Sequence, residues 1–239
     1  MLKSHHFRPR LERVVPGGRS TNLLRLLACG AAAIAAVAVL TLPRLALAQY
    51  TTRVLDASAL HPPAGARVAI VEFSDPECPA CATANPTLMA AVEKYKIPWV
   101  RHDFLLPYHI WSPAAAVYAH WFDSQSKALG DDYRNQLFAN QRFIYNRLLL
   151  RDFTSNFAKS HGIALPFEVD PQHKFMAEAE ADTELARRTG IDHTPTIFVV
   201  TSGSKGPPYI EVTDLSKLYQ IIDEAIADTP EPARKPHRK

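Results

Sequence analysis

The feature that most constrains this chain is a pair of cysteines, Cys78 and Cys81, set between a strand-like segment and a helical one. Residues 68–73 read Val-Ala-Ile-Val-Glu-Phe, a short apolar run typical of a strand that is buried on both faces. A helical stretch then continues to about Tyr95, and a second strand is predicted over 99–104. The cysteines therefore fall where a buried strand meets a helix, inside a strand-helix-strand unit.

This position favours redox chemistry for the cysteine pair. At a helix start the first sulfur, that of Cys78, faces backbone N–H groups and the positive end of the helix dipole, and both favour thiolate over thiol. A structural disulfide is one alternative, but closing a loop of four residues adds only about 2 kcal/mol of stability. Metal binding is the other alternative, although the sequence has no second cysteine pair and no histidines at metal-site spacing.

The rest of the chain changes character twice. Residues 107–188 have a helical pattern, strand-like segments return between 195 and 212, and a last amphipathic helix is predicted over 214–227. Because strand elements lie on both sides of the helical stretch, the core must be assembled from two separated pieces of chain. The sequence therefore predicts an α/β core interrupted by a helical insert.

Local signals bound the helices of this insert. Two cap-proline pairs are expected to start helices and two glycines to end them: Ser112-Pro113, Asp170-Pro171, Gly162 and Gly190. Four aromatic residues are expected to form the core of the insert rather than a peptide groove: Trp111, Tyr118, Trp121 and Phe122.

The first 48 residues differ in charge from the remainder. They hold seven of the 27 Lys and Arg residues and one of the 24 Asp and Glu residues, so the remainder is slightly acidic, with 20 basic and 23 acidic residues. A basic start, an apolar run over 26–42 and small residues before Gln49 predict a cleaved secretory signal. The alternatives are an uncleaved anchor over 26–42 and a lipoprotein modified at Cys29. Cleavage would leave the Cys-x-x-Cys pair as the only cysteines.

The residues around the cysteines resemble a known family. Residues 73–81, Phe-Ser-Asp-Pro-Glu-Cys-Pro-Ala-Cys, are similar to the active-site stretch of the DsbA-like proteins, the branch of the thioredoxin superfamily that carries a helical insertion. Pro86 matches the helix proline of the superfamily, and Glu72 matches its buried acid. Residues 190–196 resemble the segment that bears the family's cis-proline, so the Thr194-Pro195 bond is expected to be cis. DsbA itself has Pro-His between the cysteines, whereas this chain has Pro-Ala and lacks that histidine donor.

The resemblance implies a fold and a set of site residues. The fold class is expected to be α/β, a thioredoxin-like fold with an inserted helical domain. The expected divisions are 1–48, signal peptide; 49–106, first part of the thioredoxin-like core; 107–188, inserted helical domain; 189–228, second part of the core; and 229–239, a disordered tail. The residues expected to carry the function are catalytic Cys78, Cys81 and Glu72, and substrate-binding Pro79, Ala80, Thr194 and Pro195.

Glu72 has two interpretations. In the first it lies beneath the active site and relays a proton for Cys81. In the second it lies at a strand end and is solvated. His193 likewise either touches substrate or is an exposed loop residue.

The function expected from this resemblance is that of an exported thiol-disulfide oxidoreductase, in the periplasm or another extracytoplasmic compartment. Its expected partners are cysteine-containing exported proteins, to which it donates disulfides, and a membrane protein that restores its own disulfide. No cofactor, metal or nucleic acid is expected. The alternatives are a periplasmic reductase or isomerase, a copper-binding thiol module, and a non-catalytic chaperone with a vestigial pair.

Overall fold

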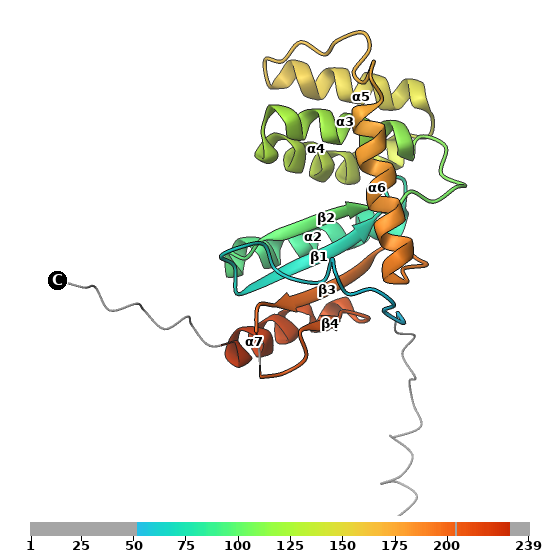
Figure 1. Ribbon diagram of the computed structural model, residues 1–239. Helices are drawn as coiled ribbons and strands as arrows, with labels where there is room; N and C mark the ends of the chain where they lie inside the picture. Colours follow the sequence, from blue (N-terminus) through green and yellow to red (C-terminus); the bar gives the residue numbers. More distant parts are fainter. Residues whose placement is uncertain (1–51, 204, 230–239) are drawn as a thin grey trace, which may run out of the picture. The chain divides into compact units, whose positions relative to one another are not determined.

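The computed structural model describes residues 52–203 and 205–229 (Figure 1). The predicted signal peptide, anchor and Cys29 lipidation site all concern residues outside this description. The elements, in chain order, are β1 (Val68–Ser74), α2 (Pro79–Tyr95), β2 (Trp99–Asp103), α3 (Ser112–Gln125), α4 (Lys127–Asn140), η2 (Gln141–Phe143), α5 (Arg147–Ser160), α6 (Lys174–Thr189), β3 (Thr196–Thr201), β4 (Tyr209–Glu211), η3 (Leu215–Lys217) and α7 (Leu218–Asp228).

Within residues 52–203 and 205–229, four strands form one mixed sheet in the order β2-β1-β3-β4. The central strand β1 pairs in parallel with β2, and antiparallel with β3, which follows the helical segment in sequence. The sheet is therefore built from two separated pieces of chain, as the sequence predicts. In this register Glu72 of β1 lies opposite Arg101 of β2 and Ile197 of β3.

Both faces of the sheet are covered, so β1 is buried along its whole length and is mostly apolar. Val68 and Ile70 belong to a core that includes buried residues of α2 and α7. Ala69, Val71 and Phe73 point to the other face and pack in a cluster that includes Ala186 of α6. Since side chains alternate along a strand, Glu72 points to the same side as Ile70, toward α2.

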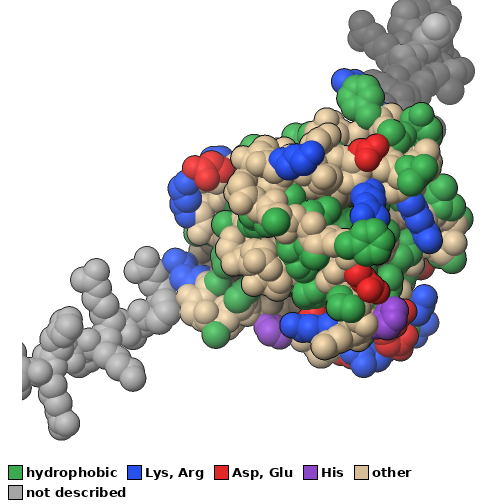
Figure 2. Space-filling view, turned by 90° about the horizontal axis from the view of Figure 1, so that it is seen from above, with side chains coloured by type: hydrophobic (Ala, Val, Ile, Leu, Met, Phe, Trp, Pro, Cys, Tyr) green, Lys and Arg blue, Asp and Glu red, His purple; other side chains and the backbone are tan. Residues whose placement is uncertain are grey.

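The helices α3, α4 and α5 form a separate layer beside the sheet, and α6 runs from that layer down to the sheet (Figure 1). Trp111 and Phe122 are fully buried at the centre of this insert, with Tyr118 and Trp121 partly buried against them. The prediction that these aromatics form the insert core is confirmed. On the face of the molecule seen in Figure 2, hydrophobic side chains are scattered among charges of both signs, and neither sign dominates.

Two predicted helix starts are wrong in detail. Trp111, not Ser112, is the N-cap of α3, because the Glu77 carboxylate supplies the acceptor that the first N–H groups of this helix need. Helix α6 begins at Lys174, beyond the Asp170-Pro171 pair. The Asp170 carboxylate nevertheless accepts hydrogen bonds from the second and third N–H groups of α6.

The predicted helix ends are confirmed. Gly190 is the C-cap of α6 with φ of 93°, and Gly162 has φ of 68° just after α5.

At the C-terminal end, Thr229 is buried and its hydroxyl donates to Ala225 O, so the folded part includes the first residue of the expected tail. Within the described ranges, no helix combines the length and apolarity needed to cross a membrane.

Candidate active site

Cys78 is the N-cap residue of α2, and Pro79 follows it at the first helical position. Proline fits there because it lacks the N–H that would be unsatisfied in any case and its φ is already helical. The Cys78 sulfur therefore faces the free N–H groups of the first helical turn. The helix start predicted from the sequence is confirmed at this residue.

The pKa of the Cys78 thiol is lowered to about 5 from its ordinary value of 9.0. The largest cause is a hydrogen bond from the Cys81 thiol, and the Thr194 side chain and the backbone N–H groups of Cys81 and Ala80 act in the same direction. Partial burial opposes the shift but is outweighed. At neutral pH such a thiol is almost fully ionised.

Cys81 has the opposite environment, although it lies only three residues further on. Its side chain has no exposed surface, and Cys78, Cys81 and Phe138 of α4 form one buried cluster. Burial, the hydrogen bond that it donates to Cys78 and the charge of Glu72 all raise the pKa of this thiol. Neither sulfur is in a disulfide in this structure. The pair thus consists of one stabilised thiolate and one protected thiol.

Glu72 is 1% exposed and lies in the middle of the sheet. Burial raises the pKa of its carboxyl to about 7, against the charge of Arg101 and a hydrogen bond from the Trp99 indole at 3.0 Å. Its Oε1 atom has no partner among the described residues. The interpretation of Glu72 as a solvated residue at a strand end is therefore wrong. A carboxyl with pKa near 7 that interacts electrostatically with both thiols is suited to proton transfer.

Arg101 is a buried cation beside Glu72 that no sequence motif indicates. Its guanidinium lies 3.4 Å from the centroid of the Trp99 ring and donates to Asn85 Oδ1 at 3.1 Å and to Asn135 Oδ1 at 2.5 Å. Burial lowers the pKa of Arg101 to about 10, while the Glu72 charge raises it. The signal that could have found Arg101 is its place opposite Glu72 on the neighbouring strand.

The Thr194-Pro195 bond is cis, as predicted, and its loop faces the first cysteine: Cys78 Sγ lies 3.4 Å from Thr194 O. An open groove of about 370 Å³ adjoins this loop. It is lined by Ala80, Thr83, Ala84, Pro195, Ile197, Val212, Thr213 and Leu215. Pro79 and Ala80 are exposed. The structure thus brings Pro79, Ala80, Thr194 and Pro195 together around Cys78. His193 is half-buried and pairs with its neighbour Asp192 at 2.8 Å.

The loop that leads into Cys78 is held from several sides. Asp75, which is fully buried, accepts hydrogen bonds from the N–H groups of Glu77 and Leu106. Gln141, from the short helix η2, donates to the carbonyls of Pro76 at 3.0 Å and Cys78 at 2.9 Å. The insert therefore braces the cysteine loop directly. Sequence spacing gave no signal for Gln141, because it lies more than 60 residues from its partners.

A sheet with β1 at its centre, a cysteine pair at the start of α2 and a cis-proline opposite define a thioredoxin-fold protein with a helical insertion. A family model described as thioredoxin matches residues 63–222, and the chain belongs to this family. Among curated proteins, none matches the sequence.

Solved structures with the same fold include DsbA-type proteins. Oxidised BdbD from Bacillus subtilis is 19% identical with a TM-score of 0.56, and the match covers 74% of this chain and 98% of that one. α-DsbA1 from Wolbachia pipientis is 17% identical with a TM-score of 0.56, covering 70% and 92%. ScsC from Proteus mirabilis is 19% identical with a TM-score of 0.55, covering 86% and 94%. The predicted fold, thioredoxin-like with a DsbA-like helical insertion, is confirmed.

Proposed function

We propose that this protein is a thiol-disulfide oxidoreductase that exchanges a Cys78–Cys81 disulfide with cysteines of extracytoplasmic proteins, as a disulfide donor. The observation that carries the proposal is the contrast between the two sulfurs. Cys78, which is 7% exposed, is held as a thiolate with a pKa of about 5, whereas complete burial keeps Cys81 protonated. A stable thiolate at Cys78 is a good leaving group, which favours transfer of the disulfide to a substrate.

The exchange has two steps. A substrate thiolate attacks Sγ of Cys78 in the oxidised protein, the Cys78–Cys81 bond breaks, and the Cys81 sulfur leaves and takes a proton from the Glu72 carboxyl. A second substrate thiolate then attacks the substrate sulfur of the mixed disulfide, and Cys78 leaves as the stabilised thiolate. The substrate loses two electrons and gains a disulfide, and the protein ends as the reduced pair.

The substrate chain would lie against the cis-proline loop. The groove next to Ala80 and Pro195 is largely apolar and open, which suits an unfolded segment with a cysteine flanked by hydrophobic residues. Pro79, Ala80, Thr194 and Pro195 are the residues proposed to contact it. Glu72 is proposed to act through Cys81 and not to touch the substrate.

The cellular setting of the proposal rests on the sequence. The signal-like pattern of residues 1–48 supports export, with the five divisions given above. Among proteins of the same fold is one described as a periplasmic thioredoxin-like protein, from Salmonella enterica serovar Typhimurium, at 21% identity. A donor must be reoxidised after each turnover, so a membrane redox partner belongs to the proposal.

A second direction of the same chemistry, reduction or isomerisation, is favoured by one observation. The residue before Cys81 is Ala80, so no histidine between the cysteines donates to the Cys78 thiolate. The equilibrium reduction potential in glutathione buffers separates the two. A potential near that of DsbA, about −120 mV, supports donation, and one near that of thioredoxin, about −270 mV, supports reduction.

The roles of the two sulfurs are tested by trapping. In Cys81→Ser the mixed disulfide on Cys78 cannot be resolved from within the protein, so adducts with exported cysteine-containing proteins should accumulate on non-reducing gels. The matched variant Cys78→Ser retains one cysteine of the pair but should give few adducts, since Cys81 is buried. Equal adducts from both variants would show that the roles are assigned wrongly.

A further inference from the structure

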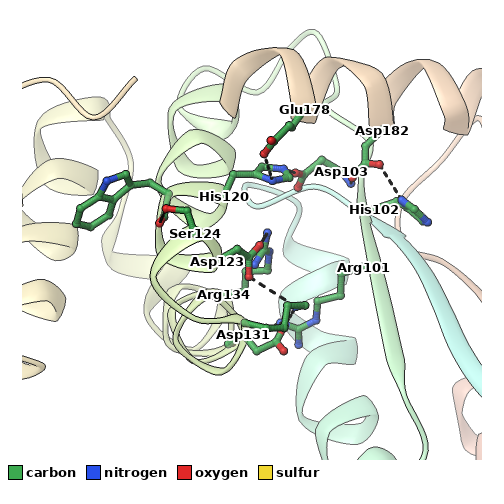
Figure 3. Close-up of polar contacts among 12 residues, drawn as sticks. Arg101, His102, Asp103, His120, Asp123, Ser124, Asp131, Arg134, Glu178 and Asp182 are labelled. Carbon is green, nitrogen blue, oxygen red and sulfur yellow. Dashed lines mark hydrogen bonds and ion pairs between the residues drawn. The ribbon is translucent and has the colours of Figure 1, made fainter. Parts of the chain in front are cut away.

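A second cluster of ionisable side chains lies where the sheet meets the insert, apart from the cysteine pair in sequence. It combines three carboxylates and two imidazoles: Asp103, Asp182, Glu178, His102 and His120. They come from three elements, because His102 and Asp103 end β2, His120 lies on α3 and the other two lie on α6. Figure 3 shows His120 between Asp103 on one side and Glu178 on the other.

We propose that Asp103, His120 and Asp182 bind a divalent transition-metal cation of the Zn²⁺ type. One ligand atom from each of these residues lies within 4.8 Å of the others. Zinc bonds of about 2.0 to 2.2 Å at tetrahedral angles place neighbouring ligand atoms about 3.3 to 3.6 Å apart. His120 Nε2 lies 2.8 Å from Asp103 Oδ2, so these two atoms would move slightly apart on binding an ion. The Asp182 carboxylate would move toward them to complete the set of ligands.

The donor set selects the class of cation. Calcium and magnesium take oxygen ligands, whereas an imidazole nitrogen beside carboxylates suits zinc and its neighbours. Three protein ligands leave a fourth position for water or for a carboxylate such as that of Glu178. Glu178 is 44% exposed and can move without disturbing the core.

The surroundings already orient the ligands as metal sites require. In the ion-free protein His120 Nε2 is hydrogen-bonded to Asp103 Oδ2 at 2.8 Å, and Glu178 Oε2, 3.3 Å from His120 Nδ1, would accept the N–H there once Nε2 releases its proton and binds the ion. His102 Nδ1 lies 2.8 Å from Asp182 Oδ1, and Asp182 Oδ2 also accepts a hydrogen bond from the N–H of Asp103. Two of the proposed ligands are thus held by a further residue, His120 by Glu178 and Asp182 by His102.

An ion at this place would join the core strand β2 to α3 and α6 of the insert. Anything that binds the folded but not the unfolded chain raises the stability of the folded form. Zinc should therefore raise the melting temperature of the protein. The disulfide chemistry of Cys78 does not depend on this site, so the inference stands independently of the proposed function.

The test uses Zn²⁺ and the full chain with all three cysteines replaced by serine, because thiolates would bind the same ion. Isothermal titration should show one Zn²⁺ per chain, and Co²⁺ in its place should give the visible absorption of a site with nitrogen and oxygen ligands. Adding His120→Asn or Asp182→Asn should weaken zinc binding by at least about 10- to 100-fold and remove the gain in melting temperature.

A matched control exists on the insert. His161 Nε2 lies 3.1 Å from Asp132 Oδ2, a His–Asp pair that gains no third candidate ligand among the described residues, so His161→Asn should leave zinc binding unchanged. The proposal is overturned if the cysteine-free chain binds no zinc, a result that needs no ligand variant to fold. It is equally overturned if His161→Asn and His120→Asn weaken binding alike.

Discussion

The start of α2 and the interior beneath it shift the pKa of a cysteine thiol in opposite directions. At the helix start, the Cys81 thiol and the backbone N–H groups of Cys81 and Ala80 favour the Cys78 thiolate, and the pKa of its thiol falls to about 5. In the interior, Cys81 and Glu72 are almost without solvent contact, and burial is the largest cause that raises both of their pKa values. Cys78, which is a stable thiolate and a good leaving group, is therefore only one helical turn from Cys81, which stays protonated.

The difference shows that the insert has a part in the chemistry as well as in the fold. Phe138 of α4 packs on the cysteine pair, and Gln141 holds the carbonyl of Cys78. A core without these contacts would leave Cys81 more open to water, and the contrast between the sulfurs would shrink. Substitutions at Glu72 and Gln141, and a change of pH around Cys78, each alter one side of this contrast.

The largest effect is expected from Glu72→Gln. General acid-base catalysis contributes about 10²- to 10⁴-fold, so steps in which Cys81 gains or loses a proton should slow by about 10²-fold. The rate at which the oxidised protein forms the mixed disulfide should also lose its dependence on a group with pKa near 7. Stopped-flow kinetics with a model peptide measures both. Glu93→Gln, on the exposed side of α2, is the control and should form the mixed disulfide at the normal rate. Similar slowing in the two variants would contradict the role given to Glu72.

The same substitution should change stability with a defined sign. The pKa of Glu72 is raised from 4.5 to about 7 by folding, so the unfolded chain releases this proton first and stability falls as pH rises between those values. The cost of the charged form is then about 3 kcal/mol at high pH. Glu72→Gln should therefore be more stable than the parent above pH 7 and equal to it below pH 4.5. Urea melts from pH 4 to 9 measure this, and a variant that is less stable at pH 8 would contradict it.

A smaller effect is expected in the stability of the reduced protein relative to the oxidised one. The lowered pKa of Cys78 stabilises the reduced fold fully above 9.0, and this contribution is lost as pH falls toward 5. At pH 8 it amounts to about 4 kcal/mol, against about 2 kcal/mol from closing the small disulfide loop. The reduced form should therefore be the more stable at pH 8 and the oxidised form at pH 4. Paired urea melts that show no change of order with pH would contradict this.

The smallest effect is expected from Gln141→Ala. The variant loses two hydrogen bonds to the cysteine loop, each worth about 1 kcal/mol, and some of this is regained from water. Thermal melts should show a loss of about 1 kcal/mol, with a slightly higher pKa at Cys78. Gln136→Ala, which removes an exposed bond to Asp132, should change neither. If Gln141→Ala matched the parent in stability and in the pKa of Cys78, the claim that Gln141 stabilises the cysteine loop would be wrong.

The sequence predicted the elements that depend on local pattern. The strand over 68–73, the helix after Cys78 and the cis bond at Pro195 all follow from apolar runs, helix signals and family spacing. It did not predict that the Glu77 carboxylate accepts hydrogen bonds at the start of α3, because Glu77 lies 34 residues from Trp111. It also gave no metal prediction for Asp103, His120 and Asp182, which only the fold brings together. Contacts between segments that are far apart in the chain leave no periodic pattern in the sequence, so they cannot be predicted from it.

The central claim is that Cys78 is a stabilised thiolate, and its ionisation can be measured directly. Thiolate absorbance near 240 nm, followed in the reduced protein from pH 3 to 10 with Cys78→Ser as the blank, reports the pKa of this one sulfur. The account predicts a single transition at about pH 5 that is absent from Cys78→Ser. A transition near the ordinary value of 9.0 would contradict the account, because the two cysteines would then lack the contrast on which the proposed exchange depends.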